Sequence, residues 1–409
     1  MIKIFNKNVI LTSATNGFMV LIGLASSVII ARYLGPEKKG IYSVLMTFVS
    51  FLLYLGNYGI TNALCYYSAS GKIKEKELFQ HAFMLSALSS LSIILIGGFL
   101  YFAIPKFHNI NISYITLALL FLVTSMNIFN NYFINIFLGQ KKINFVNFTS
   151  LARNLSELFF IYFLIITLKL NILGAIYAYI IASLMLFLII YQKSYKFLKF
   201  NTIENNYKNL IKILSFGLKA YLSNLFLYIN LYLDLFLIYY FLGATSTGIY
   251  SIASTLIRQF GFLPVAINQI ILPFSVKDIK NSRSKILNNS ITILIIFYLI
   301  VFIMFYFYGQ SIITLFFGDQ FSDSNNPLRI LLLSMLPLGL WRIFSGQIYG
   351  LNLPEKNILS SGLAALINIA MNITLIPRLG IIGAAYSSVI SYTIMCAVSY
   401  IQISKNRKR

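Results

Sequence analysis

Six ionisable side chains lie inside long apolar stretches of the chain, and they are the residues best placed to bind or carry charge. They are Arg153, Lys219, Arg258, Arg342, Glu157 and Asp234. An ionised group is costly to place in hydrocarbon, so residues of this kind generally face a charged partner, a water-filled cavity or a substrate. Because the basic members outnumber the acidic ones, the space that they line should attract an anion. Arginine suits a phosphate or diphosphate, since the planar guanidinium group can donate to two oxygens at once.

Arg258 and Asp234 lie on either side of the stretch LGATSTGIYS, residues 242–251. Asp234 is ten residues before Ala244 and Arg258 is eleven after Thr247. At 1.5 Å per helical residue, both would lie about 15 Å from the turn, so adjacent helices could bring them into an ion pair. We expect Arg258 to line a central cavity and Asp234 to modulate it. The alternative is a permanent pair that locks the two helices together.

Two further arginines extend the basic set. Arg153 and Glu157 are four residues apart, so they share one face of a helix and can pair there, either as a structural contact or as part of a transport path. Arg342 lies deep in its apolar stretch. The substrate-binding candidates are therefore Arg258, Arg342 and Arg153. Asp234 and Glu157 are the candidates for a charge pair or for carrying a coupling proton or sodium ion.

Amide side chains form the second polar group. Asn127, Asn131 and Asn135 recur every four residues and make a stripe on one helical face. Amides can bind sugar hydroxyls, but they can equally join neighbouring helices. We keep both interpretations open and name four candidates for lining a polar cavity. These are Asn127, Asn131, Asn224 and Gln269.

Signatures of soluble enzymes are missing from the sequence. It has only two histidines and two cysteines, without metal-ligand spacing, and no phosphate-binding glycine loop. We expect no catalytic residue, no bound metal and no cofactor, so the protein should not be an enzyme. The net charge of +22 comes from residues scattered over short loops. This pattern is typical of membrane orientation and argues against nucleic acid as a partner.

The elements that must position these residues are membrane-spanning helices. Hydrophobic residues make up 58% of the 409, charged residues make up 10%, and the mean hydropathy is +0.80. Apolar runs long enough to cross a hydrocarbon core of about 30 Å recur throughout. We predict an all-α polytopic membrane protein with about 12 transmembrane helices. The predicted spans are 9–31, 41–67, 79–104, 112–138, 144–168, 172–193, 210–241, 248–274, 286–308, 327–350, 356–377 and 381–403.

An internal repeat divides these spans into two halves. LGPEKKGIYS at 34–43 returns as LGATSTGIYS at 242–251, an offset of 208. LNILGAIYAYII at 170–181 returns as LGIIGAAYSSVI at 379–390, an offset of 209. We therefore predict an N-terminal lobe at 1–200, with a basic cytoplasmic linker at about 194–209, and a C-terminal lobe at 210–409. Six spans per lobe make the repeats parallel around a central cavity.

Lysine and arginine counts orient the chain. Segments on the side of the N-terminus carry 21 of them, and the opposite loops carry 7. Because basic residues are enriched in cytoplasmic loops, both termini should be cytoplasmic.

Two stretches resemble a known family. ARYLGPEKKGIYS at 31–43, and the P-R-x-G-I-x-G-A-A pattern that begins at Pro377, resemble Wzx-type polysaccharide flippases of the multidrug/oligosaccharidyl-lipid/polysaccharide superfamily. The resemblance implies two six-helix lobes around a cavity that opens alternately to each side of the bacterial cytoplasmic (inner) membrane. Related lipid II flippases line this cavity with arginines, and Arg258 is the best match. The first lobe departs from that pattern, because its first two spans contain no arginine before Arg32.

The resemblance also implies a substrate and partners. The substrate would be an undecaprenyl-diphosphate-linked oligosaccharide, moved from the inner to the outer leaflet for capsule, O-antigen or exopolysaccharide biosynthesis. Membrane lipids, a polysaccharide polymerase and chain-length machinery would be its partners. One alternative is an ion-coupled multidrug exporter, which should have an acidic residue in its first spans. The other is a membrane polysaccharide polymerase or ligase, which should have a large outward loop. The sequence has neither feature.

Overall fold

The computed structural model describes residues 2–103, 113–198, 207–265, 267, 280–350 and 353–407. Within these ranges almost every residue is helical and no β-strand occurs. Helices satisfy every backbone polar group within their own segment, which a chain in hydrocarbon requires. The predicted all-α class is confirmed.

The helices follow one another with short connections. Their bounds are α1 Ile2–Asn57, α2 Ile60–Ser70, α3 Glu75–Ala103, α5 Tyr114–Gly139, α6 Ile143–Ile161, the π-helical turn η1 Tyr162–Thr167, α7 Asn171–Ser194, the 3-10 turn η2 Tyr195–Phe197, α8 Tyr207–Gln259, α10 Lys280–Phe317, the 3-10 turn η3 Asp319–Ser324, α11 Asn325–Gly350, α12 Pro354–Leu379 and α13 Ile381–Arg407.

Ten helical segments in the described ranges are long and apolar enough to cross a membrane. Two of these, Ala14–Asn57 and Tyr221–Val265, have 44 and 45 residues. One crossing needs about 20 residues, so each of these two segments has the length of two crossings. The layout of twelve crossings in two parallel lobes remains a prediction.

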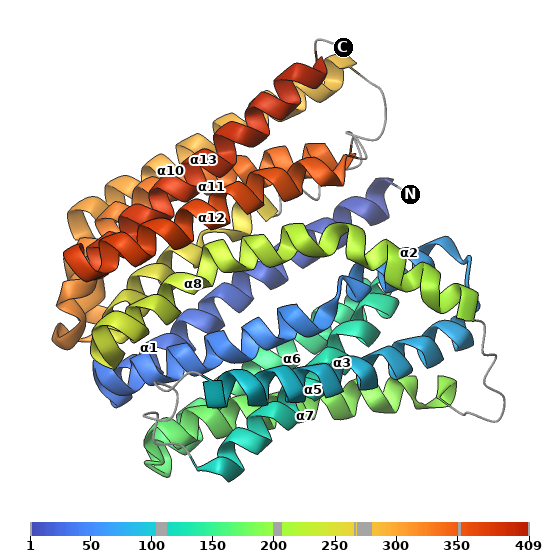
Figure 1. Cartoon of the computed structure of the whole chain (residues 1–409), viewed down its shortest axis with the longest axis horizontal. Helices are drawn as coiled ribbons and strands as arrows, with labels where there is room; N and C mark the ends of the chain where they lie inside the picture. Colours follow the sequence, from blue (N-terminus) through green and yellow to red (C-terminus); the bar gives the residue numbers. More distant parts are fainter. Residues whose placement is uncertain are drawn as a thin grey trace. The chain divides into compact units, whose positions relative to one another are not determined.

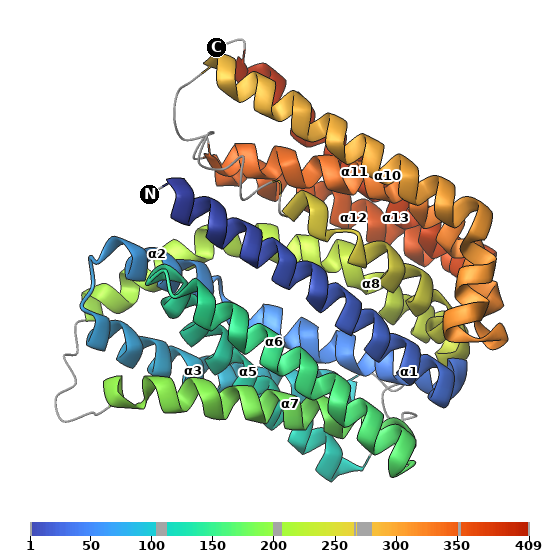
Figure 2. The same ribbon diagram turned by 180° about the vertical axis from the view of Figure 1, so that it is seen from behind.

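Both copies of the first repeated stretch reverse the chain at the same position. Gly35 has φ 74° and ψ 174°, and Gly243 has φ 82° and ψ −174°. A side chain at positive φ would clash with its own backbone, so glycine is the residue that adopts this conformation without strain. As a result α1 and α8 each consist of two helical segments that run back along one another (Figures 1 and 2). The sequence repeat thus corresponds to a repeat of backbone conformation.

The second glycine of each copy lies against the turn of the other copy. A Cβ atom on Gly40 would overlap the carbonyl oxygen of Ala244, and one on Gly248 would overlap that of Pro36. Ala244 and Pro36 are equivalent in the repeat, since each follows the glycine at which its helix turns. The two turns therefore meet backbone to backbone in a reciprocal contact, which only residues without side chains allow.

Contacts divide the chain into two compact units. The first unit contains Met1–Tyr33 and Leu45–Tyr221, and the second contains Leu34–Val44 and Leu222–Arg409. The tip of α1 thus belongs to the second unit, and α8 contributes to both. The lobe limits predicted from the sequence, 1–200 and 210–409, remain predictions about membrane topology.

The first unit has an aromatic core. Phe79 on α3 packs edge-on against Phe133 on α5, with ring centroids 5.4 Å apart. Phe129 stacks on Phe133 at 3.9 Å. Tyr132, which is fully buried, donates to the backbone oxygen of Gly56 at 3.2 Å. These contacts fix α3 and α5 against the end of α1.

The second unit is centred on α11, α12 and α13. Trp341 on α11 packs with Tyr392 and Met395 on α13, and all three side chains are buried. The indole nitrogen of Trp341 donates to Ser360 Oγ on α12 at 3.4 Å. The hydroxyl of Tyr392 donates to the carbonyl of Asn230 on α8 at 3.0 Å. This core therefore holds α8 in place, and α8 carries Asp234 and Arg258.

Candidate functional site

A basic cavity lies inside the second unit. It has a volume of about 120 Å³ and is lined by residues of α8, α10 and α11 and of the segment that follows α8. Both Arg258 and Arg342 line it, together with Tyr232 and Tyr298. None of the described residues that line it is acidic. The structure therefore brings two of the three predicted substrate-binding arginines together, and we name this space the arginine cavity.

Arg258 is held at the cavity by weak contacts. Its guanidinium lies 4.9 Å from the centroid of the Tyr232 ring. It donates to the carbonyl of Leu231 and to Thr255 Oγ1, both at 3.4 Å. Bonds of this length are near the limit for hydrogen bonding. A guanidinium has five N–H groups, so Arg258 retains donor capacity for a ligand.

Arg342 approaches the same cavity from α11. Its Nη1 donates to the carbonyl of Gly261 at 3.4 Å. A Cβ on Gly261 would lie 3.7 Å from this guanidinium, which is ordinary contact, but only 2.9 Å from the carbonyl oxygen of Arg258. Tyr298 on α10 also lines the cavity and donates to the carbonyl of Phe260 at 3.4 Å.

Asp234 and Arg258 form no direct ion pair in this structure, and the roles of both residues remain predictions. The buried carboxylate of Asp234 accepts from the hydroxyl of Tyr250 at 2.6 Å and from the backbone N–H of Leu235 at 2.8 Å. The prediction treated residues 244–247 as a loop, whereas α8 is helical again directly after Gly243. Asp234 and Arg258 are nine and fifteen residues from Gly243, which places them about 13 and 22 Å from the turn.

Arg153 and Glu157, which share a helical face, likewise form no direct ion pair. Arg153 on α6 instead directs its guanidinium to α7, 5.6 Å from the centroid of the Tyr179 ring. The hydroxyl of Tyr179 accepts from Asn127 Nδ2 on α5 at 3.0 Å. Glu157 remains partly exposed. Arg153 therefore belongs to a polar cluster of the first unit and not to the arginine cavity.

The amide candidates differ in their surroundings. Asn127 is buried and also donates to Ser183 at 3.3 Å, so it joins α5 to α7 as helix packing predicts. Asn131 is exposed and Asn224 is half-buried. Gln269 lies outside the described residues.

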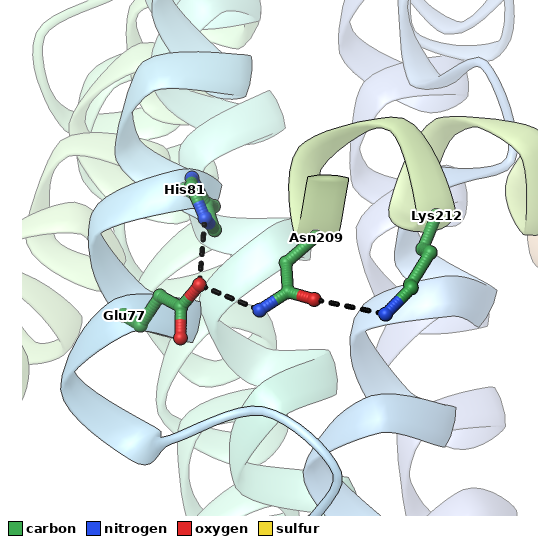
Figure 3. A network of polar contacts seen from close by, with 4 residues as sticks. All are labelled: Glu77, His81, Asn209 and Lys212. Atoms are coloured by element: carbon green, nitrogen blue, oxygen red, sulfur yellow. Dashed lines mark hydrogen bonds and ion pairs between the residues drawn. The ribbon is translucent and has the colours of Figure 1, made fainter. Parts of the chain in front are cut away.

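Sequence reasoning missed a polar network in the first unit (Figure 3). Glu77 Oε1 lies 3.3 Å from His81 Nε2 and accepts from Asn209 Nδ2 at 2.7 Å. Asn209 in turn accepts from Lys212 Nζ at 3.3 Å. The spacing of four residues between Glu77 and His81 could have predicted their contact, because residues four apart share one face of a helix. Nothing in the sequence indicated that Asn209, 132 residues later, would complete the network.

No group of three or more possible metal ligands occurs among the described residues. The long apolar helices indicate a multi-pass membrane protein. A family model described as "Polysaccharide biosynthesis protein" matches residues 5–277. The chain belongs to this polysaccharide biosynthesis family.

The chain is also similar to individual proteins, in sequence or in fold. A Shigella flexneri protein named "Putative O-antigen transporter" is 24% identical over 410 residues, covering 92% of this chain and 95% of the relative. The fold is shared with the lipid II flippase MurJ in an inward closed conformation, with a TM-score of 0.77, 19% identity and coverage of 97% and 87%. It is also shared with an inward-facing multidrug transporter of the MATE family, with a TM-score of 0.75, 17% identity and coverage of 95% and 96%. The predicted resemblance to Wzx-type flippases is confirmed.

Proposed function

We propose that this chain is a flippase that moves an undecaprenyl-diphosphate-linked oligosaccharide from the inner to the outer leaflet of the bacterial cytoplasmic membrane. The product would supply capsule, O-antigen or exopolysaccharide biosynthesis. The observation that carries the proposal is the arginine cavity, which has two guanidinium groups and no acidic residue among its described lining in a chain of the polysaccharide biosynthesis family.

The size of the arginine cavity limits the part of the substrate that it can hold. A volume of about 120 Å³ corresponds to about four water molecules at 30 Å³ each. This is enough for a phosphate group and too little for an oligosaccharide. We assign the cavity to one phosphate of the diphosphate, with Arg258 and Arg342 as its donors. The sugars would contact amides such as Asn131 of the first unit or Asn224 of the second, and Arg153 stays a substrate-binding candidate within the first unit.

Flipping would proceed by alternating access. The diphosphate and sugars would enter from the cytoplasm while the lipid tail stays in the bilayer, and the site would then open outward. The chain has no phosphate-binding glycine loop for ATP. A membrane potential supplies about 2.3 kcal/mol per charge per 100 mV. Glu157 and Asp234 are the candidates for carrying a coupling proton, and Glu157 is the more accessible of the two.

The proposed product implies partners outside the chain. A repeat unit that reaches the outer leaflet must be joined to others, so a polysaccharide polymerase and chain-length machinery would act next. The multidrug exporter remains the second candidate, because a MATE transporter shares the fold. An exporter of cationic drugs would need acidic groups at its binding site, and the described residues that line the arginine cavity include none.

Complementation tests the proposal. A strain that lacks its own capsule or O-antigen flippase is given the wild type, Arg258→Ala or Arg258→Lys, at matched membrane levels and with the cognate sugar pathway present. We expect the wild type to restore surface polysaccharide, Arg258→Ala to fail and Arg258→Lys to restore it only weakly, because an ammonium group cannot donate to two oxygens in the same plane.

Arg329 provides a matched control. It also lies over a tyrosine ring, 5.2 Å from the centroid of Tyr306, but it does not line the arginine cavity. Arg329→Ala should restore surface polysaccharide as the wild type does. Full restoration by Arg258→Ala would remove the arginine cavity from the mechanism. Resistance to cationic drugs conferred by the wild type, without any polysaccharide, would favour the exporter.

A further inference from the structure

A second basic cavity lies in the first unit, and it shares no lining residue with the arginine cavity. It is open, has a volume of about 370 Å³ and is lined by four lysines. Lys141 and Lys142 come from the turn between α5 and α6, and Lys193 and Lys196 come from the end of α7 and from η2. The described residues that line it include no acidic side chain. We name this space the lysine pocket.

Aromatic rings position the ammonium groups of the lysine pocket. Lys142 Nζ lies 5.3 Å from the ring centroid of Phe137, and Lys196 Nζ lies 4.9 Å from that of Phe197. Phe197 stacks on the buried Phe79 at 4.5 Å with an interplanar angle of 6°. The lysines are thus arranged on a packed surface of the unit's aromatic core. Cation–π contacts of this kind orient a lysine without neutralising it.

The backbone of the turn adds to the positive character of the lysine pocket. Lys141 has φ 61°, and the N–H of Lys142 bonds back to the carbonyl of Phe137 at 3.0 Å. Helix α6 begins directly afterwards at Ile143, and its first turn has neither an acidic residue nor a side-chain cap. The N-terminus of a helix carries a partial positive charge. Four ammonium groups beside such an end repel one another, so an anion bound there would relieve the repulsion.

The apolar surroundings indicate which anion would bind. Phe148 is 57% exposed and lies one turn beyond Asn144, which lines the pocket. Leu138, three residues before Lys141, is 41% exposed. A soluble phosphate makes no contact with these apolar side chains. A phospholipid carries a phosphate and acyl chains together, so it can contact both the lysines and the apolar side chains. The predicted orientation also places all four lysines on the cytoplasmic side, where basic pockets at helix ends bind anionic lipid headgroups.

We infer that the lysine pocket binds the headgroup of an anionic phospholipid of the cytoplasmic leaflet. At 30 Å³ per water molecule, its volume corresponds to about twelve waters and accommodates a glycerophosphate. The bound lipid would fix the α5–α6 turn against the end of α7. This lipid is distinct from the transported substrate and does not depend on the proposed flipping.

The test is lipid binding by the purified protein in detergent, measured by native mass spectrometry during titration with phosphatidylglycerol. The variant Lys141→Gln/Lys142→Gln/Lys193→Gln/Lys196→Gln removes four charges from the pocket. The control, Lys72→Gln/Lys74→Gln/Lys76→Gln/Lys208→Gln, removes four exposed charges elsewhere in the same unit. We expect the pocket variant to bind at least tenfold more weakly than the wild type, and the control to bind as the wild type does.

Three further measurements distinguish anionic lipid from a structural role of the lysines and from a soluble phosphate. Replacing the four pocket lysines by arginine keeps the charge and should keep the binding, so a loss in this variant too would overturn the proposal in favour of a structural role. Phosphatidylethanolamine, which has no net charge, should bind at least tenfold more weakly than phosphatidylglycerol. Equal binding of the two lipids, or of phosphatidylglycerol by the wild type and the glutamine variant, would also overturn it. Displacement of the lipid by equimolar inorganic pyrophosphate would identify a soluble phosphate as the ligand instead.

Discussion

The reciprocal contact of the two turns makes a quantitative prediction for Gly248→Ala. The added Cβ would overlap the carbonyl oxygen of Pro36 and lie 2.8 Å from its carbonyl carbon and 3.1 Å from the nitrogen of Gly40. Because these are backbone atoms, no side-chain rotation relieves the overlap and the helices must separate. Overpacking costs about 1–3 kcal/mol, and we take the upper value. Alanine gains up to about 1 kcal/mol of helix propensity, so we expect a net loss of about 2 kcal/mol.

Thermal unfolding of the purified protein in detergent measures this loss. At about 2.1 cal/mol/K of unfolding entropy per residue, a loss of about 2 kcal/mol should lower Tm by about 2 °C in a chain of 409 residues. Gly98→Ala is the matched control, since it also lies in an apolar helix but has nothing within 4 Å of the added Cβ. Its Tm should stay level or rise.

The double variant Gly40→Ala/Gly248→Ala tests the reciprocity itself. The separation that accommodates one methyl group also makes room for the second, because both glycines lie at the same crossing. The loss of stability in the double variant should therefore be smaller than the sum of the losses in the two single variants. The difference, which is the coupling energy, should exceed about 0.5 kcal/mol. A Gly248→Ala protein that unfolds at the wild-type temperature would refute the reasoning. Strictly additive losses would show that the glycines act at separate contacts.

Two further predictions concern buried polar groups. Tyr250→Phe removes the 2.6 Å hydrogen bond to Asp234 and leaves the carboxylate with the bond from Leu235. The protein should therefore lose about 1.5–3 kcal/mol in stability, measured by thermal unfolding. The double variant Tyr250→Phe/Asp234→Asn should recover part of this loss, and no recovery would argue that an uncompensated carboxylate is not its cause. Asn209→Ala removes the hydrogen-bond donor to Glu77 and should lower the stability of the protein by about 1–3 kcal/mol. It should also speed proteolysis near the start of α8. A cleavage pattern like that of the wild type would show that the network does not hold this helix.

Sequence patterns predicted the local features well, because these depend on residue type at fixed spacing. The repeated Leu-Gly and Gly-Ile-Tyr-Ser elements marked both reversals, and positive φ at Gly35 and Gly243 gives the physical reason. The apolar runs marked the helices in the same way.

Predictions that depended on how far the chain turns were less reliable. The pairing of Asp234 with Arg258 assumed a four-residue loop, and the helix that resumes directly after Gly243 moved Arg258 about two turns past its expected partner. The pairing of Arg153 with Glu157 assumed that an arginine contacts the nearest carboxylate in the sequence. In the structure the guanidinium of Arg153 instead contacts the ring of Tyr179 on α7. Contacts between helices decide such choices, and a single sequence does not contain them.

The crossings of the chain between its two units have a mechanical consequence. The chain changes unit at residues 33/34, 44/45 and 221/222. The first change is beside the kink at Gly35, whereas the other two lie in helical parts of α1 and α8. Domain hinges generally use a few loop or element-terminal residues that absorb large changes in φ and ψ. At residues 44/45 and 221/222 the chain instead passes from one unit to the other within a continuous helix, without the loop or helix end that such a hinge uses.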